Sequence, residues 1–209
     1  TFVRPDEFIA LAETAGLISE LDKLIFDKIM QTIKQFAEQG VSLPIAFNAS
    51  TFDLLADDYF VEVAARIEEY GISPSLLELE VTETQAIFNY EKINTCLCRF
   101  AGLGIKISID DFGTGYSSLA HISEIPAQII KIDRCFVTDI QESKSNQHII
   151  EMIMLLAEKF GFEVTAEGIE TEAEHNWLIE AGCYIGQGYY YAKPMFYDDA
   201  LQWLKGRYN

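Results

Sequence analysis

The chain has 209 residues, a length that suits one domain with a core of its own. Acidic residues outnumber basic ones 33 to 15, and a formal net charge of −18 opposes binding to polymeric nucleic acid and to anionic membrane surfaces. No apolar run approaches the roughly 18 residues of a membrane span and no signal peptide is seen, so we expect a cytoplasmic location, with any membrane anchor upstream.

Cysteine and histidine usage gives no sign of a disulfide framework or a zinc site. The cysteines are Cys96, Cys98, Cys135 and Cys183, and they form no CxxC pair. The three histidines are scattered along the chain. We therefore expect reduced cysteines that serve mainly in packing.

Hydrophobic spacing predicts two opening helices, after which strands and helices alternate. The first helix is expected to begin near residues 5–7 and to end at Gly16, and the second to carry a loose capping box at Ser19 and Asp22. Six strands are predicted, over residues 45–50, 76–83, 105–110, 129–133, 163–167 and 185–191. The later helices are predicted over residues 59–70, 90–100, shortly after 117, 147–160, from a capping box at Thr171 and Glu174, and 198–206.

Strands joined by helices pair in parallel through right-handed crossovers, which fits both a doubly wound sheet and a barrel. A doubly wound sheet places its site at one switch point, whereas strand ends converge at a barrel mouth. Here nearly every predicted strand ends in a polar side chain, which favours an α/β fold of the modified (β/α)8 TIM type. About six of its strands lie in this chain, so we expect about two more upstream.

The stretch from Ile105 to Leu119 contains the densest cluster of candidate residues. Its strand ends in Asp110 and Asp111, and a loop with Gly113, Thr114 and Gly115 follows. Two adjacent carboxylates repel each other unless a cation or a shared proton compensates them.

Other strand ends add oxygen ligands to these two acids. The candidate ligands are Asn48, Glu80, Asp110, Asp111 and Glu167. Such oxygen donors select Mg²⁺ or Mn²⁺, and several at one mouth can hold two metal ions that split a phosphodiester. Lys131, near Asp133, would orient the attacking water or stabilise the phosphorane. The alternative is a set of inner-barrel salt bridges, with Lys131 paired to Asp133 or Glu80.

Seven stretches of the chain resemble the EAL domain family, bacterial phosphodiesterases that hydrolyse cyclic dimeric GMP. They are PDEFIALAETAGLISELD (5–22), FNAS (47–50), LELEVTET (77–84), IDDFGTGYSSL (109–119), IKIDRCFV (130–137), AEGIET (166–171) and GQGYYYAKP (186–194). The resemblance covers nearly the whole chain in the family's order, so residues 1–209 are expected to form one EAL-type domain.

The resemblance implies roles for individual residues. The five oxygen donors above would be ligands of two Mg²⁺ or Mn²⁺ ions, and Lys131 would assist the nucleophilic water with support from Asp133. Gln187 would lie near the metal-bound waters or the phosphate, and Glu83 would anchor the loop after Asp111. The remaining residues expected at the loop or substrate are Gly113, Thr114, Gly115, Tyr116, Ser117, Glu170, Gly188 and Pro194.

The resemblance also implies a product and partners. The product would be linear pGpG, calcium would inhibit, a homodimer would form through the loop after Asp111, and a sensory or GGDEF domain would lie upstream. The Glu-Ala-Leu motif that names the family is absent from this chain and is expected upstream with the first two strands. If that segment lacks its glutamate, the protein would be a catalytically inactive cyclic dimeric GMP receptor. A third reading, an enolase-like metal barrel with Lys131 as base, is disfavoured by the motifs.

Overall fold

The computed structural model describes residues 5–115 and 119–207. Its strands are β1 (Ile45–Asn48), β2 (Leu77–Thr82), β3 (Lys106–Phe112), β4 (Ile129–Ile132), β5 (Glu163–Ala166) and β6 (Ile185–Gly186). The helices before β3 are α1 (Pro5–Ala15), α2 (Ile18–Glu38), α3 (Thr51–Leu55), α4 (Tyr59–Tyr70), the 3₁₀ turn η1 (Pro74–Leu76), α5 (Glu83–Ile87) and α6 (Tyr90–Leu103). Those after β3 are α7 (Leu119–Ile122), α8 (Arg134–Val137), α9 (Lys144–Phe160), α10 (Glu172–Glu180) and α11 (Tyr197–Arg207). No helix within these described ranges is long and apolar enough to cross a bilayer.

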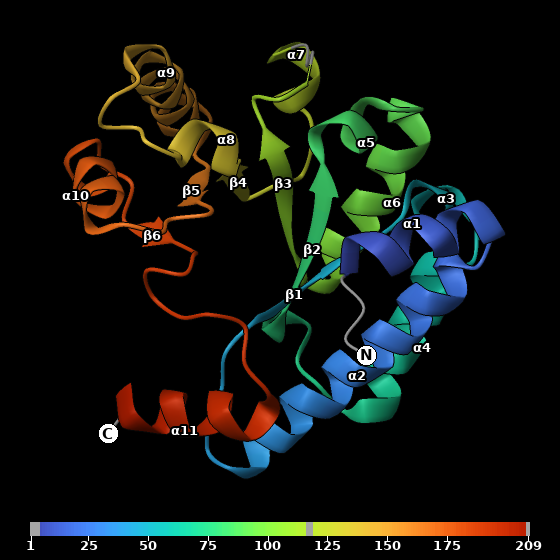
Figure 1. The fold of residues 1–209 in the computed structure, drawn as a ribbon. Coiled ribbons are helices and arrows are strands. Elements are labelled where there is room, and N and C mark those ends of the chain that lie inside the picture. Colours follow the sequence, from blue (N-terminus) through green and yellow to red (C-terminus); the bar gives the residue numbers. More distant parts are fainter. Residues whose placement is uncertain (1–4, 116–118, 208–209) are drawn as a thin grey trace.

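The strands form one parallel sheet in the order β1-β2-β3-β4-β5-β6. A doubly wound sheet would reverse its strand order at a switch point, and this sheet does not. It curls into part of a barrel, with α4 and α6 outside one half and α9 and α10 outside the other (Figure 1). The predicted barrel-type α/β class is confirmed.

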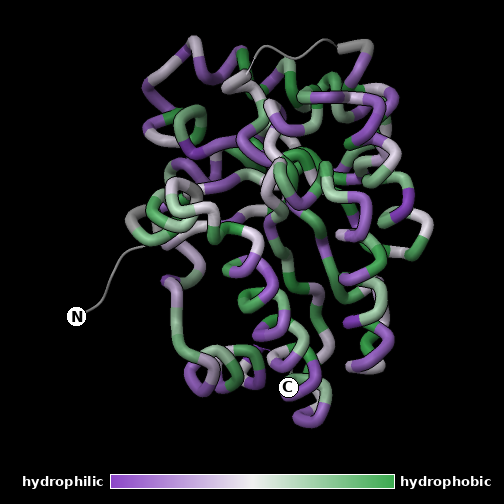
Figure 2. The backbone as a smooth tube through the Cα atoms, turned by 90° about the vertical axis from the view of Figure 1, so that its right-hand side faces the viewer, coloured by the Kyte–Doolittle hydropathy of each residue, from purple (hydrophilic) through white to green (hydrophobic). Residues whose placement is uncertain are grey.

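The core lies between the outer face of the strands and these helices. Leu79, Ile107 and Ile130 are fully buried there, against apolar residues such as Phe100 of α6 and Ile150 of α9. Figure 2 shows hydrophobic segments (green) along the strands and on parts of the surrounding helices. The predicted apolar face is therefore the helix-covered one, which leaves the other face and its polar strand ends to the barrel interior.

The C-terminal part returns to the beginning of the chain. After β6 a long segment crosses to α11, which lies beside the C-terminal end of α2 (Figure 1). Tyr197 stacks on Phe36 with ring centroids 5.1 Å apart, and the Lys205 Nζ donates to Gln39 Oε1 at 2.8 Å. Among the described strands, β1 and β6 are the edges, and this segment spans the side between them.

Of the two predicted capping boxes, one is absent and the other is confirmed. The helix α2 begins at Ile18 with Leu17 at the N-cap and no side-chain cap, so Ser19 and Asp22 form no capping box there. The capping box of Thr171 and Glu174 is present at α10.

The last predicted strand, residues 185–191, is also much shorter than expected. Pairing ends at Gly186, because the N–H groups of Tyr191 and Ala192 both donate to the carbonyl of Gly188 and close a turn. The three consecutive tyrosines at residues 189–191 favour a strand by composition, but the stretch also contains Gly186 and Gly188, and glycine weakens a strand.

Candidate active site

Both acids at the end of β3 reach the same mouth because the strand contains a bulge. Ile109 pairs with Ile130 but Phe112 pairs with Ile132, so β3 uses one more residue than β4 over this step. Asp111 has a positive φ of 53°, a conformation that aspartate tolerates better than most residues. In a regular strand Asp110 and Asp111 would face opposite sides, and the inserted residue removes that alternation while returning Phe112 to the core.

One lysine lies at the centre of the polar strand ends. The Nζ of Lys131 on β4 is 2.5 Å from a carboxylate oxygen of Glu80, 2.7 Å from Glu167 and 3.3 Å from Asp110. The Lys131 side chain is only 6% exposed, and the three acids are 12–19% exposed. Acids near the C-terminal ends of β2 and β3 and the acid directly after β5 thus converge on one buried ammonium group.

The buried charges of this cluster do not balance. Burial raises the pKa of Glu80 and of Glu167 although both are paired to Lys131. Burial disfavours the Lys131 ammonium too, but Glu80 and Glu167 outweigh it and raise the pKa of Lys131 above its ordinary value. Asp111 adds another acid, its pKa raised by burial and by the charges of Asp110 and Asp133. One ammonium therefore faces an excess of carboxylates, which a divalent cation would neutralise.

The salt-bridge alternative is partly realised. Lys131 pairs with Glu80, as that alternative proposed, but its other partners are Asp110 and Glu167. Asp133 instead caps α8, where its side chain accepts the Cys135 N–H at 2.9 Å. In the described ranges no three Asp, Glu, His or Cys side chains are already arranged to hold a metal ion. The carboxylates converge on Lys131 instead.

Asn48 and Gln187 lie at the strand ends that flank this cluster. Asn48 ends β1 and is the register partner of Glu80 on β2, so the two residues share the inner face. Gln187 follows β6, and its backbone N–H donates to the Ala166 carbonyl at 2.8 Å, next to Glu167.

Glu83 holds the loop after Asp111. Its Oε2 accepts the N–H of Gly113 at 2.8 Å and that of Gly115 at 3.3 Å, and the Thr114 hydroxyl donates to the Asp111 carbonyl at 2.8 Å. A Cβ on Gly115 would lie 3.1 Å from the Glu83 carboxyl carbon, so the loop needs glycine to approach this closely. Tyr116 and Ser117 lie outside the described residues.

The other predicted residues lie farther along the rim. Glu170 pairs with Arg134 at 2.6 Å. Gly188 lies against the backbone of Ile169, and Pro194 lies in the segment that leads to α11, outside the Lys131 cluster. Sequence reasoning missed Arg134, whose place directly after Asp133 at the end of β4 was the available signal.

Gly188 permits a direct prediction for stability. A Cβ there would lie 2.1 Å from the Ile169 carbonyl oxygen, and backbone cannot move aside as a flexible side chain can. We expect Gly188→Ala to lower the free energy of unfolding by about 3 kcal/mol. Gly71→Ala is the control, because Gly71 has φ +66° but nothing within 4 Å of its added Cβ, and should cost about 1 kcal/mol. Urea unfolding compares them, and equal losses would show that the Ile169 contact is unimportant.

Comparison with known proteins shows which family the chain matches. The EAL domain family profile matches residues 1–194. PA2567 of Pseudomonas aeruginosa, named as a cyclic di-GMP phosphodiesterase, is 37% identical over 205 residues that cover 98% of this chain and 35% of that protein. The chain therefore spans about a third of that curated relative.

Two solved structures share the fold. The PaMucR phosphodiesterase in complex with c-di-GMP has a TM-score of 0.91 and 32% identity, over 95% of this chain and 81% of that chain. BlrP1 of Klebsiella pneumoniae, solved with calcium and cyclic di-GMP, has a TM-score of 0.82 and 28% identity, over 92% of this chain and 48% of that chain. The profile match, the sequence identity and the shared fold together show that this chain belongs to the EAL domain family.

Proposed function

We propose that this chain forms the main part of a divalent-metal-dependent phosphodiesterase that hydrolyses cyclic dimeric GMP to linear pGpG. The carrying observation is the excess of partly buried carboxylates around Lys131, which bound divalent cations would balance. PA2567 and PaMucR, which bear the names of phosphodiesterases, support the choice of substrate.

The oxygen donors at the strand ends fit Mg²⁺ or Mn²⁺ better than softer metals. The residues that would hold two such ions are Asn48, Glu80, Asp110, Asp111 and Glu167. When bound, the ions would neutralise phosphate charge and lower the pKa of a water.

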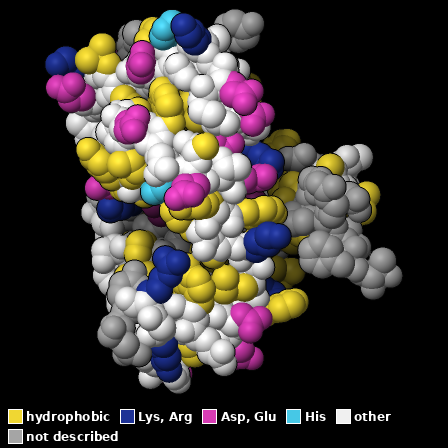
Figure 3. All heavy atoms as spheres, turned by 60° about the vertical axis from the view of Figure 1, so that its left-hand side comes forward, with side chains coloured by type: hydrophobic (Ala, Val, Ile, Leu, Met, Phe, Trp, Pro, Cys, Tyr) yellow, Lys and Arg dark blue, Asp and Glu magenta, His cyan; other side chains and the backbone are white. Residues whose placement is uncertain are grey.

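The chain's own residues would orient and stabilise the reaction. The three hydrogens of the Lys131 ammonium face Glu80, Glu167 and Asp110 in this structure. When these acids hold the ions instead, the ammonium would be able to donate to the attacking water or to the phosphate oxygens. Glu83 keeps the loop at Gly113 and Gly115 close to the end of β3. Acidic side chains (magenta) are spread over the face that includes α9 and α10 (Figure 3), so an anionic substrate needs its attraction from inside the site.

We propose further that upstream strands complete the barrel. Beside the edge strand β1, a cavity of about 360 Å³ is lined by Phe26 of α2, Phe47 of β1 and Val63 of α4. A strand paired with β1 would cover this cavity and supply the missing family motif. A sensory or GGDEF domain farther upstream, a homodimer through the loop after Asp111 and a cytoplasmic location of this domain belong to the same proposal.

The test uses this chain and a form extended upstream by about two strands. Each is mixed with cyclic dimeric GMP and with Mg²⁺, Mn²⁺, Ca²⁺ or EDTA, and pGpG is followed by chromatography. We expect the extended form to produce pGpG with Mg²⁺ or Mn²⁺ and none with Ca²⁺ or EDTA. If the extended form folds and binds the nucleotide without product, the protein is a receptor and the enzymatic proposal is wrong.

A further inference from the structure

Glu174, in the first turn of α10, is a buried carboxylate outside the Lys131 cluster and is only 3% exposed. One of its oxygens, Oε2, accepts the backbone N–H groups of Glu170 and Thr171, both at 2.9 Å. The other, Oε1, accepts the N–H of Asp139 at 3.1 Å. One side chain therefore joins the loop after β5 to the segment after α8.

A capping box does not require this second attachment. In that motif the third helical residue only has to accept the N–H of the N-cap residue, and Gln or Glu does this equally well. The Asp139 N–H donates to Oε1 of Glu174, the oxygen that the capping box does not use. A glutamine would place a donor amide nitrogen there, facing the Asp139 N–H. The carboxylate at position 174 thus does something that a helix cap alone would not need.

The loop that Glu174 holds begins at a proposed metal ligand. The Glu167 N–H donates to the Ile132 carbonyl at 3.0 Å, and the Ile169 N–H donates to the Gln187 carbonyl at 3.1 Å. The next two amides of the loop are the ones that Glu174 accepts. The backbone that follows Glu167 is therefore fixed from both neighbouring strands and from α10.

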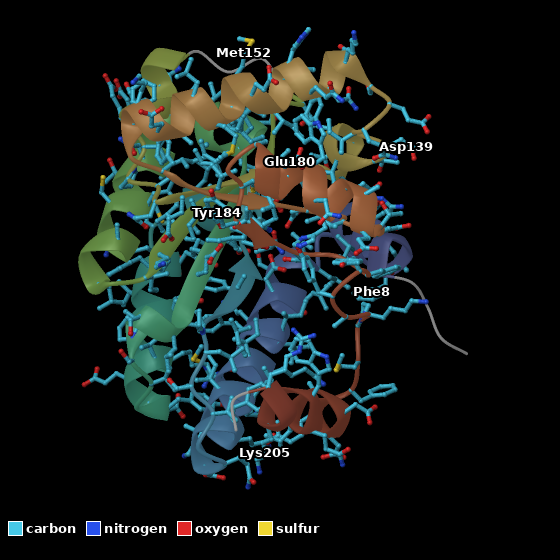
Figure 4. All side chains as sticks on the ribbon, turned by 90° about the vertical axis from the view of Figure 1, so that its left-hand side faces the viewer. Phe8, Asp139, Met152, Glu180, Tyr184 and Lys205 are labelled. Carbon is cyan, nitrogen blue, oxygen red and sulfur yellow. The ribbon has the colours of Figure 1, made fainter. Side chains whose placement is uncertain are left out.

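The far end of the bridge lies on the element that follows β4. The helix α8 begins directly after Asp133 and its following turn contains Asp139, which has a positive φ of 53°. In Figure 4 Asp139 lies away from Glu180, which marks the C-terminal end of α10. Arg134 at the start of α8 pairs with Glu170 at 2.6 Å and forms a second link between α8 and the loop after β5.

We propose that Glu174 is a positioning residue that fixes the loop carrying Glu167 against the segment after β4, and thereby sets the spacing of the acids around Lys131. This inference rests on the proposed metal-dependent function. Partners that orient ligands in this way commonly change metal affinity or activity 10- to 100-fold when they are removed.

The test compares Glu174→Gln with Thr171→Val in the form of the protein that shows turnover. Glu174→Gln keeps the capping bond and loses the bridge to Asp139, whereas Thr171→Val removes the hydroxyl that accepts the Glu174 N–H at 3.2 Å and leaves the bridge. We expect Glu174→Gln to weaken Mn²⁺ binding about tenfold and to lower kcat about tenfold, with KM nearly unchanged. Thr171→Val should lower the melting temperature but keep Mn²⁺ affinity and kcat. Equal effects of both variants on Mn²⁺ affinity would overturn the proposal.

A second measurement needs no variant and decides the matter even if Glu174→Gln does not fold. Mg²⁺ titration with amide hydrogen exchange should slow exchange at Asp139 as well as at Glu170, because coupling through the bridge is reciprocal. If bound Mg²⁺ slowed amide exchange at Glu170 but not at Asp139, the proposed role of Glu174 would be wrong while the proposed function would stand. Failure of the protein to bind Mg²⁺ would instead contradict the proposed function.

Discussion

Asp110→Asn is expected to lower turnover of cyclic dimeric GMP by at least about 100- to 1,000-fold in the form of the protein that shows activity. The asparagine removes one negative charge from the mouth but keeps an oxygen that can accept the Asp111 N–H, a bond of 3.0 Å in the native chain. Glu80→Gln should act in the same way, because Glu80 lies 2.5 Å from Lys131. Chromatographic measurement of pGpG at saturating Mn²⁺ checks both variants.

Stability distinguishes this loss from a folding defect. Burial raises the pKa of Asp111, and the charge of Asp110 raises it further. The Asp110 charge also contributes to the raised pKa values of Glu80 and Glu167. The acids therefore repel one another in the metal-free state. Metal-free Asp110→Asn should therefore unfold at an equal or higher urea concentration than the native chain. The control is Glu163→Gln. Glu163 lies at the start of β5, at the end of the strand away from Glu167, and pairs with Lys106 at 3.2 Å on the surface. If Asp110→Asn turned over cyclic dimeric GMP as fast as Glu163→Gln, Asp110 would have no role in catalysis.

Lys131→Met is expected to cost about 3–5 kcal/mol of unfolding free energy in EDTA, because it leaves buried carboxylates without their cation. Glu80 and Glu167 already have raised pKa values in the folded chain, and the loss of the ammonium should raise them further. Groups with a higher pKa in the folded state hold more protons there, so stability falls as pH rises. Lys131→Met should therefore have a lower free energy of unfolding at pH 8 than at pH 5. Mn²⁺ should restore part of the lost stability but should not restore turnover.

Urea unfolding at both pH values, with EDTA or Mn²⁺, measures this effect. Lys106→Met is the matched control, since Lys106 is 47% exposed and its surface pair should contribute at most about 1 kcal/mol. A loss in Lys131→Met no larger than in this control would show that the acids do not depend on the ammonium.

Strand placement and the inner-face acids followed from sequence patterns, since apolar alternation on β2 and β3 identifies the buried face. That same alternation could not place Asp110 and Asp111 together, because it requires neighbours on a strand to face opposite sides. The bulge depends on tertiary pairing with β4, which no local pattern encodes. For the same reason, only Glu80 of the two partners expected for Lys131 pairs with it; Asp133 does not, and the pairing with Asp110 and Glu167 was not predicted.

The residues missed at the rim have a common cause. The capping box at Thr171 and Glu174 was visible because it lies within a few residues of sequence. The bond from Asp139 to Glu174 spans 35 residues, and the ion pair of Arg134 with Glu170 joins the start of α8 to the loop after β5. Such contacts appear only once β4 and β5 lie side by side.

The sequential strand order has a consequence for synthesis on the ribosome. Each strand after β1 pairs with the strand made just before it, so the sheet can grow from one edge while the rest of the chain is still being translated. The contact of Tyr197 with Phe36 is different, because it joins residues made far apart in time. Until α11 has left the ribosome, the face of α2 that contains Phe36 is uncovered. A chaperone could bind that face of the nascent chain until α11 packs on it.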